Sequence, residues 1–240
     1  MNAAAEMIAT SLAERTQGFD PAIPGTPESV WGKALATQEP WAPRPGPLLV
    51  VSPHPDDEVL GAGGLMHMWS AWHRPVALVS VTDGEAAFPD WKDLKARRRA
   101  ELDRALGALS SSRIYRVHLG LADGAGGANK TALREALTIL CELQPTLIAP
   151  YERDGHPDHD AAGETCLEIA REFKLPIARY PIWAWHHQHP RDFEGRRIGR
   201  FLLDAAAQAA RCSSKQAGKS TRTRRIARVR RGSARSRCVT

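Results

Sequence analysis

Short apolar runs alternate with longer helix-like stretches between residues 47 and 185 of this chain. Apolar runs of this length, bounded by turn residues, are typical of strands that are covered on both faces. The predicted strands are 48–52, 76–81, 114–119, 147–151 and 177–185, and the predicted helices are 58–72, 94–109, 131–143 and 161–173. Because successive strands then need crossover connections, the pattern predicts an α/β fold with a mainly parallel sheet and helices on both faces.

Polar segments follow four of the predicted strands. In parallel α/β sheets the active site lies at the carboxyl ends of the strands, so these segments are the candidate site. Two of them, 52–58 and 151–159, are rich in histidine and aspartate and contain the motifs PHPDDE at 53–58 and HPDH at 156–159. The other two are TDGE at 82–85 and GLADG at 120–124.

The spacing of the two histidine motifs favours a zinc site. Catalytic zinc takes three nitrogen or oxygen ligands and keeps a fourth position for water. His54 and Asp57, three residues apart in a tight turn, can converge on one ion, and His159 can complete the set. Asp56 then remains beside the metal as a candidate base, and His156 as a hydrogen-bond or proton donor. The alternative is that these residues only cap helices, since Asp and Pro are common in a first helical turn.

These motifs resemble those of the PIG-L/LmbE-like deacetylases, a family that includes enzymes acting on N-acetylglucosamine conjugates. The resemblance covers about residues 47–185 and rests on PHPDDEVLGAGG at 53–64 and GHPDHDAAG at 155–163. The segments at 82–85, 97–109 and 119–124 are also similar to the family. The resemblance implies a Rossmann-like three-layer sandwich, a Zn²⁺ site and amide hydrolysis.

The resemblance also implies roles for single residues. It gives metal binding to His54, Asp57 and His159, and the base to Asp56. It implies an acid or oxyanion-binding role for His156, an orienting role for Asp158, and contacts with sugar hydroxyls for Arg98 and Asp123. The expected function is therefore a zinc-dependent hydrolase that removes an N-acetyl group from an N-acetylglucosamine-type conjugate.

Charge divides the chain unevenly. Residues 211–240 hold 11 Lys and Arg and no acidic residue, which leaves 22 basic against 27 acidic residues in 1–210. Residues 21–47 are rich in Pro and Gly, and the strand pattern begins after them. We therefore expect three parts: an N-terminal arm over 1–46, an LmbE-like zinc deacetylase domain over 47–210, and a basic, disordered tail over 211–240. Two explanations account for the tail, a functional extension or the product of a reading-frame shift.

Two other functions fit the sequence. One is a zinc amidase acting on another small amide or a thiol conjugate. The other is a nucleic-acid-binding protein that uses the arginine-rich tail, the one segment expected to contact phosphates.

No apolar run reaches the roughly 20 residues of a membrane span. The four cysteines are far apart, which favours a reducing, cytoplasmic setting.

Overall fold

The computed structural model describes residues 24–88, 90–110 and 114–193, and within these ranges five strands form one parallel sheet. The strands are β1 (Leu48–Ser52), β2 (Val76–Thr82), β3 (Ile114–Leu121), β4 (Thr146–Pro150) and β5 (Ile177–Tyr180). The predicted basic tail, and residues 1–23 of the predicted arm, lie outside the described residues.

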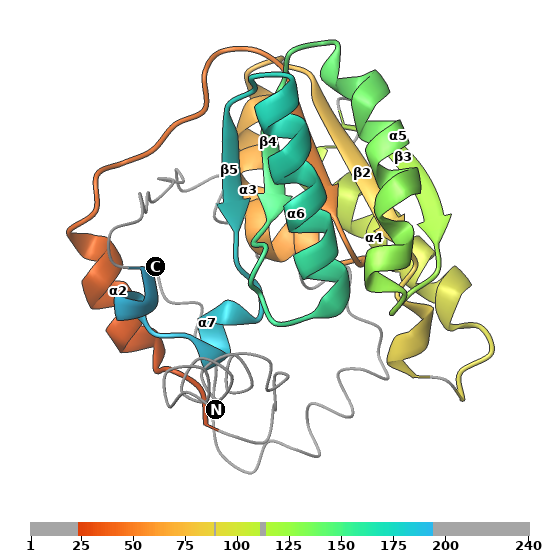
Figure 1. Cartoon of the computed structure of the whole chain (residues 1–240), viewed down its shortest axis with the longest axis horizontal. Coiled ribbons are helices and arrows are strands. Elements are labelled where there is room, and N and C mark those ends of the chain that lie inside the picture. Colours follow the sequence, from red (N-terminus) through yellow and green to blue (C-terminus); the bar gives the residue numbers. More distant parts are fainter. Residues whose placement is uncertain (1–23, 89, 111–113, 194–240) are drawn as a thin grey trace, which may run out of the picture.

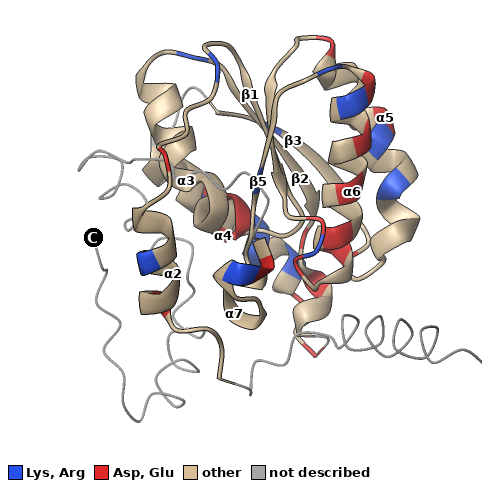
Figure 2. Cartoon of the chain, turned by 60° about the vertical axis from the view of Figure 1, so that its left-hand side comes forward, with Lys and Arg blue, Asp and Glu red and all other residues tan. Residues whose placement is uncertain are grey.

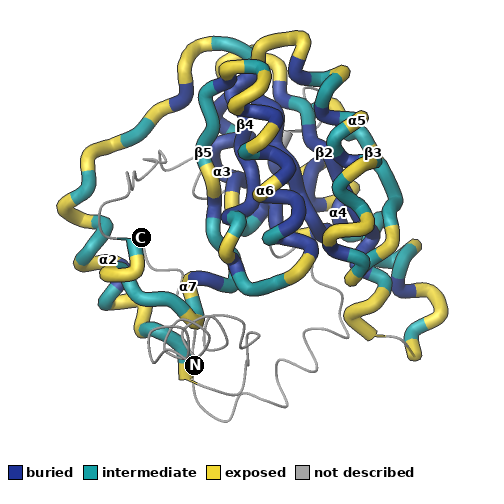
Figure 3. Tube along the Cα trace, viewed as in Figure 1, coloured by how far each residue is buried: buried dark blue, intermediate teal, exposed yellow. Residues whose placement is uncertain are grey.

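Helices cover both faces of this sheet, as Figure 1 shows. The helices α3 (Asp57–Ala71) and α4 (Leu94–Ser110) pack on one face, and α5 (Lys130–Cys141) and α6 (Pro157–Glu172) on the other. Each face has its own cluster of buried side chains. The strands β1, β2 and β4 are buried almost throughout, whereas the edge strands β3 and β5 are mostly half-buried (Figure 3). The predicted α/β three-layer sandwich with a parallel sheet is confirmed.

The strand order β3-β2-β1-β4-β5 explains why two distant loops meet. The chain moves outward from β1 to β3, then crosses to the other side of β1 to form β4. The carboxyl ends of β1 and β4 therefore lie side by side at a topological switch point, where α/β sheets bind their ligands. The two histidine motifs follow these two strands.

Close packing of α3 on the sheet accounts for the glycines at its start. A Cβ atom built on Gly61 would lie 2.1 Å from Cδ2 of Tyr180, the last residue of β5. The Tyr180 hydroxyl donates to the Val51 carbonyl oxygen at 2.6 Å, which fixes the ring against the helix. Gly61 therefore serves the close packing of α3 on the sheet, whereas a Cβ atom on Gly63 would meet only ordinary contacts, the nearest at 3.6 Å.

The predicted strand 177–185 is wrong in its second half. The strand β5 ends at Tyr180, and residues Ala184–His187 form the short helix α7. Proline 181 has no N–H to continue the ladder. The Asp154 carboxylate instead accepts hydrogen bonds from the backbone N–H groups of residues 182–184. Trp183 and Trp185 consequently do not alternate along a strand.

The described part of the N-terminal segment contains the helix α2 (Glu28–Ala36), which the sequence analysis did not predict. Its Trp31 is buried, packs edge-on against Trp185 with ring centroids 4.7 Å apart, and donates to the Trp185 carbonyl oxygen at 2.9 Å. Short 3₁₀ turns at Glu85–Ala87, Gly126–Asn129 and Pro190–Phe193 complete the fold.

Charged residues occur along α5 and α6 (Figure 2). Three ion pairs join the two helices there, between Lys130 and Glu164 and between Arg134 and both Glu168 and Glu172. Among the described residues, no helix combines the length and the apolar character that crossing a membrane requires.

Candidate active site

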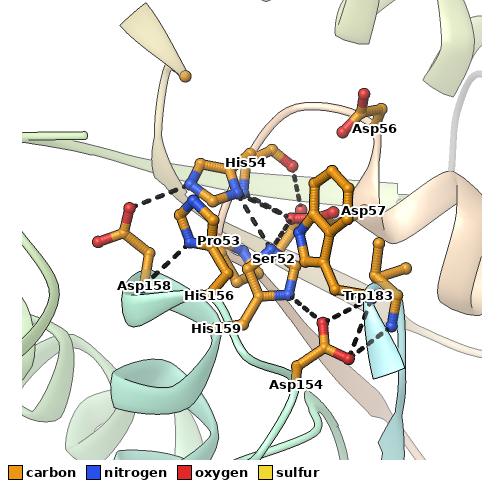
Figure 4. Close-up of polar contacts among 12 residues, drawn as sticks. Ser52, Pro53, His54, Asp56, Asp57, Asp154, His156, Asp158, His159 and Trp183 are labelled. Carbon is orange, nitrogen blue, oxygen red and sulfur yellow. Dashed lines mark hydrogen bonds and ion pairs between the residues drawn. The ribbon is translucent and has the colours of Figure 1, made fainter. Parts of the chain in front are cut away.

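The two histidine motifs bring three side chains to one point, although His54 and His159 are 105 residues apart in sequence (Figure 4). Nδ1 of His54 lies 3.2 Å from Nε2 of His159. Oδ2 of Asp57 lies 3.3 Å from the first of these nitrogens and 3.1 Å from the second. The three atoms thus form a nearly equilateral triangle. All three residues are buried.

Carboxylates lie behind both rings of this triangle. Nε2 of His54 is 3.0 Å from Oδ1 of Asp123 and 3.1 Å from Oδ2 of Asp158. Nδ1 of His159 is 2.8 Å from Oδ2 of Asp154. In the neutral rings these outer nitrogens carry the hydrogen, so both inner nitrogens present lone pairs toward Asp57. Three converging lone pairs repel one another unless a cation lies between them.

The electrostatics of the triangle favour positive charge. Burial lowers the pKa of His54, but the carboxylates of Asp123, Asp158 and Asp57 outweigh it and raise the pKa to about 11. The pKa of His159 rises to about 9, because Asp57 and Asp154 outweigh its burial. Burial also opposes ionisation of Asp57, yet the two rings hold its pKa below the ordinary range. The same surroundings would stabilise a metal cation.

Asp56 lies beside the triangle and not in it (Figure 4). Its side chain is 63% exposed and lines the cavity. The low-polarity surroundings, and then the nearby Asp57 carboxylate, raise the pKa of Asp56 to about 6, against the opposing effect of Arg98. Asp56 is thus a carboxylate free to exchange a proton, next to one that is held ionised.

His156 occupies the N-cap of α6. Its Nδ1 accepts a hydrogen bond from the Asp158 backbone N–H at 3.3 Å. Burial, and then the neighbouring His54 and His159 rings, lower the pKa of His156, so the ring is neutral at pH 7. With Nδ1 accepting, the hydrogen of the neutral ring is on Nε2, which can donate to a ligand in the cavity.

A cavity of about 480 Å³ opens onto the triangle. This volume is within the usual range for small-molecule sites. Polar groups of His54, Asp56, Asp57, Asp123 and His156 line one part, and apolar side chains from α3, α4 and the loop after β2 line another. Trp183 contributes to the wall, so the segment expected to form a strand instead borders the site.

The structure also places the residues expected to orient the site or contact sugar. The Asp158 carboxylate contacts the His54 ring and accepts from the backbone N–H groups of Gly124 and Gly126, so it orients a candidate ligand. Asp123 accepts from the Ala86 N–H at 2.7 Å through its other oxygen. Arg98 lines the cavity and donates to the carbonyl oxygens of Pro55 and Gly84. The expected contacts of Asp123 and Arg98 with sugar hydroxyls stay predictions.

Sequence reasoning assigned no role to three buried carboxylates at this edge of the sheet: Asp83, Asp154 and Glu58. Asp83 and Asp154 lie in polar segments that the strand-end rule had selected, and Glu58 ends the first motif. The sequence therefore indicated that these three carboxylates lie at the carboxyl ends of the strands. Their partners come from other elements, which only the fold brings near.

Asp83 is the centre of a charged cluster just after β2. Its carboxylate is fully buried and accepts two hydrogen bonds from the Arg99 guanidinium, both at 2.7 Å. His118 lies 2.9 Å away and Lys95 3.2 Å away. Burial raises the pKa of Asp83, but Arg99, His118 and Lys95 together outweigh it and hold the pKa well below its usual range.

This cluster predicts an acid-sensitive contribution to stability. A carboxyl whose folded-state pKa is depressed stabilises the protein above its unfolded-state pKa of about 3.9 and loses that contribution as pH falls below it. We expect Asp83→Asn to lower the free energy of unfolding at pH 7 by about 1.5–3 kcal/mol. The deficit should shrink toward pH 3.

Denaturant unfolding of the wild-type protein and of Asp83→Asn between pH 7 and pH 3 measures this difference in the free energy of unfolding. Asp103→Asn is the matched control, because Asp103 forms an exposed ion pair with Arg116 that should contribute less than about 1 kcal/mol. A deficit that is constant with pH would contradict the prediction.

Comparison with known proteins identifies the family. Residues 49–170, half of the chain, match the PIG-L family, described as GlcNAc-PI de-N-acetylase. The chain belongs to the PIG-L family. This segment runs from β1 to α6 and contains both histidine motifs, so the resemblance expected from the motifs is confirmed.

Two relatives of this PIG-L family chain are named as deacetylases. Diacetylchitobiose deacetylase of Thermococcus kodakarensis is 28% identical over 139 residues, which cover 54% of this chain and 51% of the relative. The 1D-myo-inositol 2-acetamido-2-deoxy-alpha-D-glucopyranoside deacetylase of Nocardia farcinica is 30% identical over 157 residues, covering 52% of each chain. The chain spans about half the length of the relatives it matches.

A solved structure shares the fold of this PIG-L family chain but has a different named activity. GalB, the 4-carboxy-2-hydroxymuconate hydratase of Pseudomonas putida, superposes with a TM-score of 0.59 at 20% identity, covering 80% of this chain and 92% of GalB. Since this likeness concerns the fold alone, the activity has to be argued from the side chains of the site.

Proposed function

We propose that this chain is a zinc-dependent hydrolase that removes the N-acetyl group from an N-acetylglucosamine-type substrate. The observation that carries the proposal is the triangle of His54 Nδ1, Asp57 Oδ2 and His159 Nε2, with Asp56 beside it in one cavity. The family assignment and the names of the two relatives, both deacetylases of acetamido sugars, support it.

The donor set fits zinc. Tetrahedral ligands about 2.0–2.1 Å from zinc lie about 3.3 Å from one another, and the three separations here are 3.1–3.3 Å. Two imidazoles and one carboxylate are typical of a catalytic zinc site that keeps its fourth position for water or substrate. The carboxylates of Asp154 and Asp158 lie 2.8 Å and 3.1 Å behind the rings, where the outer carboxylate partners of such ligands usually lie.

The two adjacent carboxylates divide the chemistry. When bound, zinc lowers the pKa of its water to about 7 and polarises the amide carbonyl. Asp57 is held ionised between two imidazoles and serves as a ligand. Asp56 faces the cavity without touching the triangle, and it takes the proton of the attacking water. Proton transfer of this kind contributes about 10²–10⁴-fold to a rate.

His156 is placed to donate a hydrogen bond in the same reaction. Its Nε2–H is available because Nδ1 caps α6, and the ring lines the cavity within 4.7 Å of the His54 ring, measured between centroids. We assign it to the oxygen of the amide as that oxygen gains negative charge. Loss of one such donor typically costs about 10²–10³-fold in kcat.

Acetate release tests the proposal. The purified chain is incubated with N-acetylglucosamine, N,N′-diacetylchitobiose, an inositol glycoside of N-acetylglucosamine, and N-acetylcysteine as a small amide without sugar. We expect acetate from at least one sugar and none from N-acetylcysteine. Chelation should abolish release, and stoichiometric zinc should restore it. Release that persists after zinc has been removed completely would refute the zinc mechanism, and release from N-acetylcysteine alone would refute the sugar substrate.

A further inference from the structure

The backbone at Asp56 is strained. Its φ is 119° and its ψ −27°, a conformation that side-chain-bearing residues rarely adopt. The other non-glycine residues with positive φ in the described chain are His73, Gln144 and Lys174, with φ between 51° and 58°. They follow the C-terminal ends of helices, where the left-handed conformation is usual. Asp56 instead precedes the first residue of α3, so its strain has another cause.

Arg98 of α4 holds one side of the peptide unit between Pro55 and Asp56. Its NH2 group donates to the Pro55 carbonyl oxygen at 2.7 Å and lies 3.5 Å from Oδ1 of Asp56. Its NH1 group donates to the Gly84 carbonyl oxygen at 3.1 Å. A Cβ atom on Gly84, whose φ is +65°, would lie 2.0 Å from the Arg98 NH1 atom. The loop after β2 is therefore shaped around this guanidinium.

Glu58 holds the other side of the same peptide unit. The Asp56 backbone N–H points to Oε2 of Glu58 at 3.3 Å, and the Ser52 hydroxyl, from the end of β1, is 2.7 Å from the same oxygen. Glu58 is fully buried, so its position is fixed by the core. Both polar groups of the peptide unit, its C=O and its N–H, are thus bonded to side chains from different elements.

We propose that Arg98 is a positioning residue, which together with Glu58 clamps the 55–56 peptide unit in its strained conformation and so presents the Asp56 carboxylate to the reacting water. This inference rests on the proposed function for the role of Asp56. The clamp itself does not, because its geometry involves only this chain. It differs from the sugar-contact role expected for Arg98, which would act on substrate binding.

Steady-state kinetics of the zinc-loaded enzyme separate the two roles. Misplacing a catalytic group by about 1 Å costs on the order of 10²-fold in rate, so Arg98→Gln should lower kcat by about that factor and leave KM nearly unchanged. Arg98→Lys should recover little, since the two bonds come from different nitrogens of the planar guanidinium and a single ammonium nitrogen does not reproduce that geometry. Arg104→Gln, an exposed position on the same helix, is the matched control with unchanged kcat. A raised KM with unchanged kcat would overturn the proposal.

Thermal unfolding of the same zinc-loaded proteins tests the clamp without any substrate. Asp56→Gly and Asp56→Ala both lose the carboxylate, so their comparison isolates the backbone strain caused by a Cβ atom. Since an alanine at positive φ is destabilising, we expect Asp56→Gly to melt about 2–6 °C above Asp56→Ala. In an Arg98→Gln background, and in an Arg98→Lys background if the first does not fold, this difference should vanish or reverse. In an Arg104→Gln background it should persist.

The kinetic and melting measurements distinguish failure of the proposed function from failure of the clamp. If no acetamido sugar is hydrolysed, the proposed function fails while the melting comparison still reports on the clamp. If the enzyme is active and the difference between Asp56→Gly and Asp56→Ala is the same with and without Arg98, the clamp is refuted whatever the kinetics. Coupling in the melting temperatures together with a loss confined to kcat supports it.

Discussion

Asp56→Asn is expected to lower kcat for acetate release by about 10²–10⁴-fold while the protein keeps one equivalent of zinc. Asparagine has nearly the same shape as aspartate but cannot accept the proton of the attacking water. The three atoms that form the ligand triangle all belong to other residues, so the metal site stays intact. Metal analysis of the purified variant, beside its rate of acetate release, measures both quantities.

His159→Ala should lose activity and zinc together. The His159 ring is fully buried, supplies one corner of the triangle and contacts Asp154 on its far side. Its removal leaves two ligands, and the buried carboxylates of Asp57 and Asp154 each lose one partner. Asp103→Asn, a surface change far from the motifs in sequence, serves as the control that retains both properties. Equal zinc loss in Asp56→Asn and His159→Ala would overturn the division of roles between the two neighbouring aspartates.

Asp154→Asn is expected to weaken zinc binding by about 10–100-fold, although Asp154 lies outside the triangle. The buried Asp154 carboxylate contacts His159 Nδ1 at 2.8 Å and accepts backbone N–H groups from residues 182–184. An asparagine would turn its NH₂ group toward one of these donors. The free energy of unfolding should fall as well, by about 1.5–3 kcal/mol, since a charge-assisted hydrogen bond is lost.

Competition with a chromophoric chelator gives the zinc dissociation constant, and denaturant unfolding gives the stability. Asp160→Asn is a control from the first turn of α6, because Oδ1 of Asp160 accepts from the Gly155 backbone N–H at 3.1 Å and an amide oxygen can replace it. Zinc affinity that is unchanged in Asp154→Asn would show that the His159 ring is oriented without this carboxylate.

Local patterns in the sequence determined much of the architecture. Apolar runs located β1 to β4 to within two residues at each end. The runs of β1, β2 and β4 are nearly continuous because a strand buried on both faces has almost no polar positions, whereas the edge strand β3 is half-buried and carries Arg116 and His118. The strand-end rule then selected the segments that form the site. The ligand triangle of His54, Asp57 and His159 was predicted from residue type and spacing, since few side chains bind zinc and only two of the four strand-end segments contain histidine.

The tertiary structure decided what depends on contacts between distant segments. The sequence does not state that β4 lies beside β1, yet this neighbourhood alone brings His159 to His54. The end of β5 at Tyr180 is set by the Asp154 carboxylate, nearly 30 residues earlier, which binds the chain as it leaves the sheet. The strained peptide unit at Asp56 likewise requires Arg98 and Glu58 from two helices. The sequence of a segment determines its secondary structure and the side chains that it carries. The partners of those side chains, and so their chemistry, are determined only when the sheet assembles.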